Sequence, residues 1–251
     1  MICNSILASQ EMENQWIVKS LLFFFASCVS ELIFRKVVVD VWYPRWLYQK
    51  DGNESVQKLR SFRTRLSQIF SMMCFTLAMF LTAVYALASQ PSLLSDIINN
   101  HSESSQTALC LALGIHLWNG MDEMLNKWSG DSTNLVVLHH CGLLLMFVPA
   151  LHSRKMMPLY CIGLISMVHS SMAYLTMLLK LLDSPRYQIL GKCVHWANYT
   201  LRFLNWLCLY FWFLVNFQHS CQFFIGQLRL LMMLPINIKV LLAKGYYRNE
   251  S

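Results

Sequence analysis

Charged residues are scarce in this sequence. Asp, Glu, Lys and Arg together make up 13% of its 251 residues, about half of the share that is typical of a soluble domain. Hydrophobic residues make up 56%, and the mean hydropathy is +0.41. Apolar runs of about 20 residues recur along the chain, which is the length that a helix needs to cross a hydrocarbon core. The composition therefore excludes an ordinary soluble domain and predicts an all-α, polytopic membrane helix bundle.

Paired cysteine motifs are also missing. The nine cysteines are scattered, most of them within apolar runs, with neither CxxC spacing nor the clustering of a disulfide framework. We interpret them as small apolar packing residues and expect no metal site. Linkers rich in Pro, Gly or Ser are absent as well, as are internal repeats and coiled-coil heptads. A single membrane domain is therefore expected.

The formal net charge is +7. It does not indicate binding to nucleic acid, because the basic residues are distributed unevenly along the chain. Eight of them lie in the segment 35–65, against three acidic residues. The segment 89–106 has neither Lys nor Arg, and it holds the sequon Asn100-His101-Ser102. Because basic loops stay in the cytosol while short loops without basic residues are translocated, we expect 35–65 to be cytosolic and Asn100 to be lumenal. Alternation then places the N-terminus in the lumen and the C-terminus in the cytosol.

Seven segments are candidate transmembrane helices, and we expect six or seven of them to span the membrane: 15–37, 67–88, 107–126, 134–152, 156–181, 196–218 and 222–243. Lys19 and Glu31 interrupt the first segment. Acidic residues stand where a signal peptide has its basic region, so we interpret this segment as an uncleaved anchor. Its two charged residues are expected to snorkel or to face the bundle.

The adjacent histidines His139 and His140 lie within a long apolar run of the fourth candidate helix. They follow its expected cytosolic start by five to six residues, which places them roughly 8–9 Å below the membrane surface. Ionisable side chains inside a membrane are costly and usually face a protein interior or a wet cavity, and an imidazole can take up or release a proton near neutral pH. The pair is therefore the leading candidate for a functional site. Adjacent positions on a helix suit one metal ion poorly, since an i, i+4 spacing is favoured.

Other polar residues fall in the same cytosolic half of the expected bundle, on three further helices. They are Asp122, Asn119, Glu123, His116, His169 and Arg202. Each has a simpler interpretation than a functional one: the two acidic residues as helix-end residues, the arginine as a snorkelling side chain, and the single histidines as hydrogen-bonded packing residues. As functional groups, Asp122 and Asn119 are candidates for contact with a bound cofactor.

These segments resemble those of the TLC family, which includes ceramide synthases, translocon-associated TRAM proteins and ceroid-lipofuscinosis membrane proteins. Val137-Leu138-His139-His140 is similar to the histidine-pair motif of that family. The segment 162–182, which holds His169, is similar to the helix that follows, and Tyr199-Thr200-Leu201-Arg202-Phe203 resembles the arginine-bearing region. The resemblance implies residues 1–57 as an anchor helix and basic loop, 58–245 as a TLC-like membrane domain and 246–251 as a short tail.

The sequence departs from the ceramide synthases at two positions. Those enzymes carry aspartates directly after the third histidine and three positions further on, where this chain has Ser170 and Ala173. The histidines and Arg202 remain, which favours the less characterised relatives that keep the histidine pair without the aspartates. The resemblance thus implies membrane lipids as partners and the endoplasmic reticulum as the location. It implies no tightly bound cofactor and no nucleic acid, and it leaves a homo-oligomer open.

Two functions from different classes follow. In the first, the chain binds or senses lipid in a cavity that opens to the cytosol, as part of membrane lipid homeostasis. In the second, it is an acyltransferase that moves an acyl group from long-chain acyl-CoA to a sphingoid or glycerolipid substrate. His139 or His140 would then act as a general base or as a transient acyl acceptor. His169 would assist, and Arg202 would bind an anionic group.

Overall fold

The structure is a computed structural model, and the part of the chain that it describes is built from helices. The described residues are 2–34, 36–37, 56–126, 133–182, 184, 186–197, 200, 207 and 211. The elements are α1 (Ile2–Phe34), α3 (Val56–Ser89), the short 3-10 helix η2 (Pro91–Ser95), α4 (Glu103–Asn126), α5 (Thr133–Ser153), α6 (Met157–Ile165), α7 (Met167–Leu181) and α8 (Arg186–Ala197). These residues contain no β-strand.

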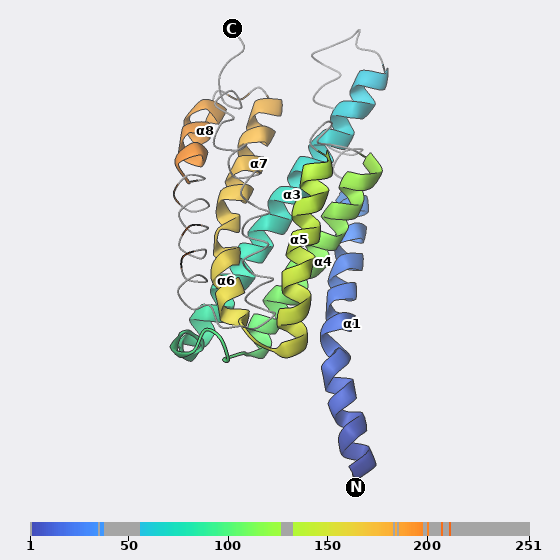
Figure 1. Ribbon diagram of the computed structural model, residues 1–251. Helices are drawn as coiled ribbons and strands as arrows, with labels where there is room; N and C mark the ends of the chain where they lie inside the picture. Colours follow the sequence, from blue (N-terminus) through green and yellow to red (C-terminus); the bar gives the residue numbers. More distant parts are fainter. Residues whose placement is uncertain are drawn as a thin grey trace.

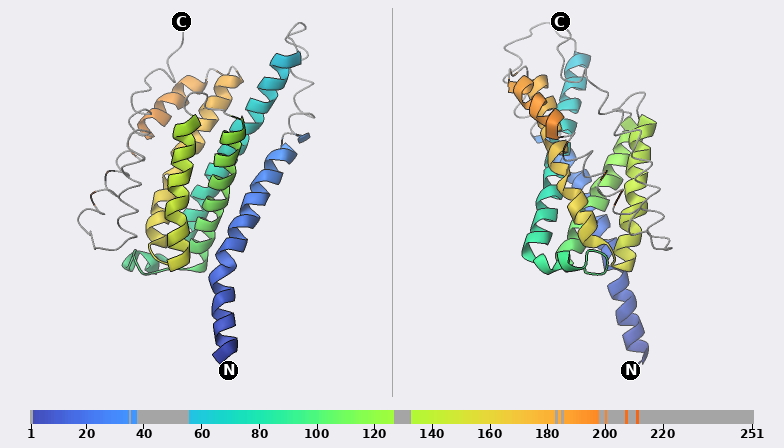
Figure 2. Two further views of the ribbon diagram at one scale, coloured as in Figure 1. Left: turned by 45° about the vertical axis from the view of Figure 1, so that its right-hand side comes forward. Right: turned by 60° about the vertical axis from the view of Figure 1, so that its left-hand side comes forward.

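With α6 and α7 taken together, successive helices run in alternating directions along a common axis (Figure 1). One end of the bundle therefore carries the connections 90–102 and 154–156. The opposite end carries the end of α4 and the start of α5. The first turns of α1 project beyond the other helices, as both views in Figure 2 show. This up-and-down arrangement is the one that short connections between membrane helices require.

Four helical segments are long and apolar enough to cross a membrane: Gln15–Phe34, Thr64–Ser89, Thr133–Ser153 and Met157–Leu181. Their outer faces carry large apolar side chains; on α1, for example, Leu22, Phe25 and Leu32 are exposed. These observations are compatible with an integral membrane protein and agree with the all-α fold predicted from composition. The expected helices 196–218 and 222–243 lie almost entirely outside the described residues.

Helix α4 lies at the centre of the described bundle. It packs against α1, α3, α5 and α6, and most of its side chains between Ala108 and Glu123 are buried. It is nevertheless not one of the four apolar segments, because Asp122, Glu123 and other polar residues lower its hydropathy. A helix of this kind is stable inside a bundle only if neighbouring helices keep its polar groups away from lipid.

The buried carboxylates and most of the apolar core lie in different halves of the bundle. The apolar core is formed by α3, α4, α5 and α6 near the connections 90–102 and 154–156, and includes Met79, Leu109, Ile115 and Leu143. At the opposite end, the buried residues of α1 and α4 include carboxylates and a histidine. The interior is therefore apolar toward one end of the bundle and polar toward the other.

Three helix boundaries differ from those predicted. Helix α3 begins at Val56, so the basic residues of 58–65 belong to a helix rather than to a loop. The expected single helix 156–181 is interrupted at Ser166, whose hydroxyl donates to the carbonyl of Gly163 at 2.7 Å. The backbone N–H of Ser166 also bonds to the Gly163 carbonyl, three residues back, where a regular α-helix has a spacing of four. Finally, α8 begins at Arg186, inside the connection predicted before residue 196.

Candidate functional site

The predicted histidine pair lies in the first half of α5, and its two rings have different surroundings. Successive residues of an α-helix point about 100° apart. His140 faces α4 at Gly120, where an added Cβ atom would lie 3.2 Å from the His140 Cβ. The glycine therefore allows α4 and α5 to approach closely at this level. The ring centroid of His139 lies 5.3 Å from that of His140.

A third histidine, His116 of α4, completes a cluster with the pair. Its Nδ1 lies 3.2 Å from Nδ1 of His140, within hydrogen-bond distance. Its ring centroid lies 5.3 Å from that of His140 and 6.3 Å from that of His139. Phe147, two turns along α5, stacks on the ring of His116, with 6.0 Å between the ring centroids. The sequence favoured a packing role for His116, because the register between α4 and α5 is not visible in either helix alone.

The contact between His116 and His140 restricts the protons on both rings. A neutral imidazole has one nitrogen that donates and one that accepts. One of the two Nδ1 atoms must therefore carry a hydrogen and the other must not. The rings consequently adopt complementary tautomers, or one ring is charged and donates to the other.

One face of α4 continues this polar surface toward the end of the bundle. At 100° per residue, His116, Asn119, Gly120 and Glu123 fall within one arc of the helix, and all four are buried. Glu123 lies about one turn beyond Gly120, the residue against which His140 packs, and its Oε1 accepts a hydrogen bond of 2.8 Å from the hydroxyl of Thr133. The cluster thus joins imidazoles and a carboxylate along the α4–α5 interface.

The two candidates for cofactor contact lie beside the cluster. Among the described residues, the Oδ1 atom of Asn119 is buried and has no hydrogen-bond partner, so it retains an acceptor. Asp122 is 2% exposed and accepts a hydrogen bond of 2.7 Å from the amide of Asn126. It lies about 100° around α4 from Glu123, on the side of Trp118 rather than on that of His140.

Glu31 of α1 is a further buried carboxylate that was not predicted as a site residue. It is 1% exposed and accepts a hydrogen bond of 2.7 Å from the indole nitrogen of Trp118. Of the two environments expected for this side chain, the structure selects the one that faces the bundle. The signal available in the sequence was a charged residue within an apolar run. That signal does not show that Trp118 on α4 is its partner.

His169 belongs to a different part of the fold. It is buried on α7, which packs mainly against α3 and α8. Its Nδ1 contacts the carbonyl oxygen of Ser166, and its Nε2 lies 3.2 Å from the hydroxyl of Ser170. A neutral hydroxyl thus contacts this imidazole. Arg202 lies outside the described residues.

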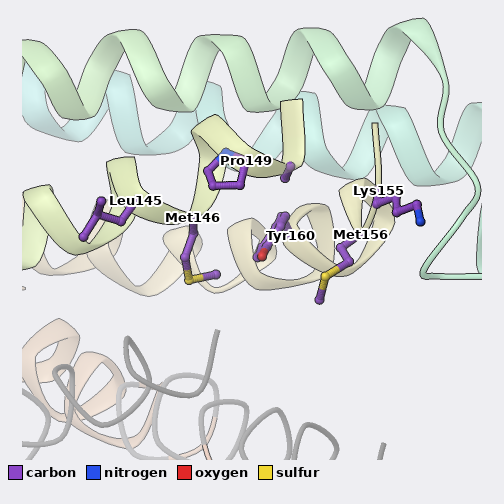
Figure 3. A pocket seen from close by; sticks show the side chains of 7 residues that line it. Leu145, Met146, Pro149, Lys155, Met156 and Tyr160 are labelled. Atoms are coloured by element: carbon purple, nitrogen blue, oxygen red, sulfur yellow. The ribbon is translucent and has the colours of Figure 1, made fainter. Parts of the chain in front are cut away.

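A small hollow in the described bundle lies between α5 and α6 (Figure 3). Its lining includes Met146, Pro149 and Tyr160 of α5 and α6 and Lys155 of the turn between them. It has room for about one water molecule. The hollow belongs to the apolar half of the bundle, and its size and lining do not suit a lipid or a cofactor.

The fold and the site define a class: a helical bundle compatible with a membrane, with a partly buried histidine–carboxylate cluster between α4 and α5. No set of three or more His, Cys, Asp and Glu side chains within the described ranges is arranged to hold a metal ion. No protein-family model matches the sequence, and no curated protein or solved structure matches it.

Proposed function

We propose that this chain is a TLC-like, multi-pass protein of the endoplasmic reticulum that binds lipid in membrane lipid homeostasis. The observation that carries the proposal is the contact of His116, His139 and His140 with one another inside a bundle whose outer faces are apolar. Buried polar groups inside a membrane are expensive, and they mark sites that handle polar ligands. The imidazoles and the Asn119 oxygen supply donors and acceptors for a lipid head group.

The orientation proposed from the charge distribution places this cluster in the cytosolic half of the membrane. The alternating helix directions support it, because they bring the end of α4 and the start of α5 to the same end of the bundle as the start of α3 (Figure 1). The segment around residues 58–65, at the start of α3, is strongly basic. Basic segments of membrane proteins stay in the cytosol.

Lipid retention tests the proposal. We expect His139→Ala/His140→Ala protein, purified in mild detergent, to lose its copurifying lipid in native mass spectra, because the variant removes two of the three imidazoles. His152→Ala is the matched control, since His152 is exposed near the other end of α5. Equal lipid occupancy in the double variant and the wild type, with both proteins folded, would refute the proposal.

Acyl transfer is the second candidate, and the arrangement of His140 favours it. This imidazole contacts His116 at Nδ1, as a general base that is oriented by a partner does. After incubation with palmitoyl-CoA, an acyl-transferring protein would show an acyl adduct in its intact mass, with free coenzyme A released. The adduct should be missing from the His139→Ala/His140→Ala variant. An unmodified wild-type mass, with no acylated lipid formed, rejects this candidate.

A further inference from the structure

A series of polar side chains lies along the α4–α5 interface. The series begins at Thr133, the first residue of α5, whose hydroxyl donates to Glu123. Glu123 lies about one turn beyond Gly120 on the same face of α4, and His140 packs against Gly120. His140 in turn contacts His116 through the two Nδ1 atoms. His116 lies ten residues before the end of α4, which corresponds to about 15 Å along the helix. The series therefore connects one end of the bundle with its middle.

The atoms in this series can exchange protons. A carboxylate accepts and releases a proton, and each imidazole can take a proton at one nitrogen while it gives one up from the other. The contact between two Nδ1 atoms is suited to such a transfer, because the donor and the acceptor are chemically equivalent. Packing alone does not require the two imidazole rings to face each other through their Nδ1 atoms.

We propose that Glu123, His140 and His116 form a proton relay between the α4–α5 end of the bundle and its centre. A proton from water is taken up by the Glu123 carboxylate and passes to Nε2 of His140. The Nδ1–H of His140 then moves to the lone pair on Nδ1 of His116. His140 is left neutral with its hydrogen on Nε2, His116 becomes an imidazolium, and Glu123 is again a carboxylate. The return of the proton reverses these steps.

Other titratable groups lie on the elements packed around the relay. They are His139 on α5, Asp122 on α4, Glu31 on α1 and Tyr160 on α6. Asp122 and Glu31 lie on the α1 side of α4, whereas Tyr160 contacts Phe147 at 6.0 Å between ring centroids. The relay does not depend on the proposed lipid function, since a chain that binds no lipid can still transfer protons along this path.

Nitrogen-15 NMR of histidine-labelled protein in lipid bilayers tests the first step of the proposal. We expect coupling across one Nδ1–H···Nδ1 hydrogen bond, with complementary tautomers on His116 and His140. The coupling should be missing from His116→Asn protein. It should persist in His101→Asn protein, because His101 is exposed in the connection between η2 and α4. Two rings that both carry their hydrogen on Nε2, without coupling, would overturn the proposal.

Exchange of the shared proton with water tests the path. In Glu123→Gln protein we expect exchange to slow by about 100-fold, the lower limit of what a positioned proton-transfer group contributes. Thr133→Val, a milder change that leaves the carboxylate in place, should slow exchange in the same direction. The matched controls are Glu103→Gln and Thr107→Val, at the other end of α4. Exchange that is unchanged in Thr133→Val and in any folded Glu123→Gln protein would show that protons reach the pair by another route.

Discussion

Each of the three carboxylates buried in the polar half of the bundle accepts a hydrogen bond from a neighbouring side chain. Glu31 accepts from Trp118, Glu123 from Thr133 and Asp122 from Asn126. A charge removed from water is tolerated only if hydrogen bonds or opposite charges replace its hydration. The hydrogen bonds of Glu31 and Glu123 join different helices and help to determine which faces of α1, α4 and α5 meet, whereas that of Asp122 lies within α4.

Removal of the Glu31 carboxylate should loosen α1. In Glu31→Ala protein the buried indole N–H of Trp118 loses its acceptor, and we expect a loss of about 1.5–3 kcal/mol, the range for hydrogen bonds to charged groups. Equilibrium unfolding by SDS in mixed micelles measures this difference. Glu31→Gln, which keeps an oxygen acceptor, should lose less, and Glu103→Ala should lose little, because its side chain is 86% exposed. Wild-type stability of Glu31→Ala protein would contradict this assignment.

His139 and His140 could be singled out as candidates from the sequence, because two imidazoles within an apolar run are conspicuous in one dimension. The sequence did not show the contacts of His116 and Glu31. Their partners, His140 and Trp118, lie on other helices, and each contact depends on the relative translation and rotation of two helices. Small residues such as Gly120 allow these close approaches, but they do not reveal which helix is the neighbour.

At the scale of elements, α1 and α4 pack with their backbones in close contact. A Cβ atom added to Gly114 of α4 would lie 2.7 Å from both the Phe24 nitrogen and the Ser20 carbonyl oxygen. Ser20 and Ser27 are buried on the facing side of α1. Small residues at such contacts allow van der Waals packing, which contributes to helix association in membranes.

A methyl group at Gly114 should force the two helices apart. The atoms that it would meet are mainly backbone atoms, which cannot move aside, so we expect Gly114→Ala to cost about 1–3 kcal/mol, as overpacking typically does. Gly163→Ala is the matched control, because nothing lies within 4 Å of its added Cβ atom. SDS unfolding of the two variants makes the comparison. Equal stability would mean that α1 and α4 are not packed in this way.

The connection between η2 and α4 is organised by a single carboxylate. Asp96 accepts hydrogen bonds from the backbone N–H groups of Ile98 and Asn99 and from the Asn99 side chain. The hydrogen bond from the Asn99 side chain, followed by that from its backbone, lowers the Asp96 pKa below the ordinary value of 3.8. The Asp96 carboxylate therefore contributes fully to the stability of this connection above the pKa of the unfolded chain. The contribution is lost as the pH falls through the lower pKa of the folded chain.

Acid should open this connection before it affects the bundle. We expect the Ile98 and Asn99 amides to lose hydrogen-exchange protection as the pH is lowered below about 4, the region in which an ordinary aspartate begins to be protonated. Mass spectrometry with correction for intrinsic exchange rates provides the measurement. In Asp96→Asn protein the protection should not change across this pH range. A wild-type profile that stays equally flat would rule out the Asp96 mechanism.

Apolar periodicity predicted the existence of the helices between residues 67 and 181 but not all of their ends. At the break, the Ser166 hydroxyl bonds to the carbonyl of Gly163, but Ser20 and Ser27 make similar bonds within the uninterrupted helix α1, so a serine does not predict a break. The central place of α4 was also not evident. Hydropathy ranks helices by their contact with lipid, so a helix that is surrounded by others scores low.

At the scale of the whole molecule, alternating helix directions fix which connections share a side of the membrane. With the proposed orientation, an N-glycan acceptor tag placed before Met1 should be modified in microsomes, whereas the same tag after Ser251 should not. Mobility shifts reversed by an endoglycosidase report both results. A modified C-terminal tag with an unmodified N-terminal tag would invert the orientation and place the cluster in the lumenal half.

The division of the interior into an apolar half and a polar half also bears on the asymmetry of biological membranes. The apolar half is closely packed around residues such as Met79, Leu109 and Leu143, so the described bundle offers no through-pore to a polar head group. A lipid that reaches the histidine cluster must therefore come from the leaflet beside it. The composition of that leaflet, rather than that of the bilayer as a whole, would then determine which lipids the protein encounters.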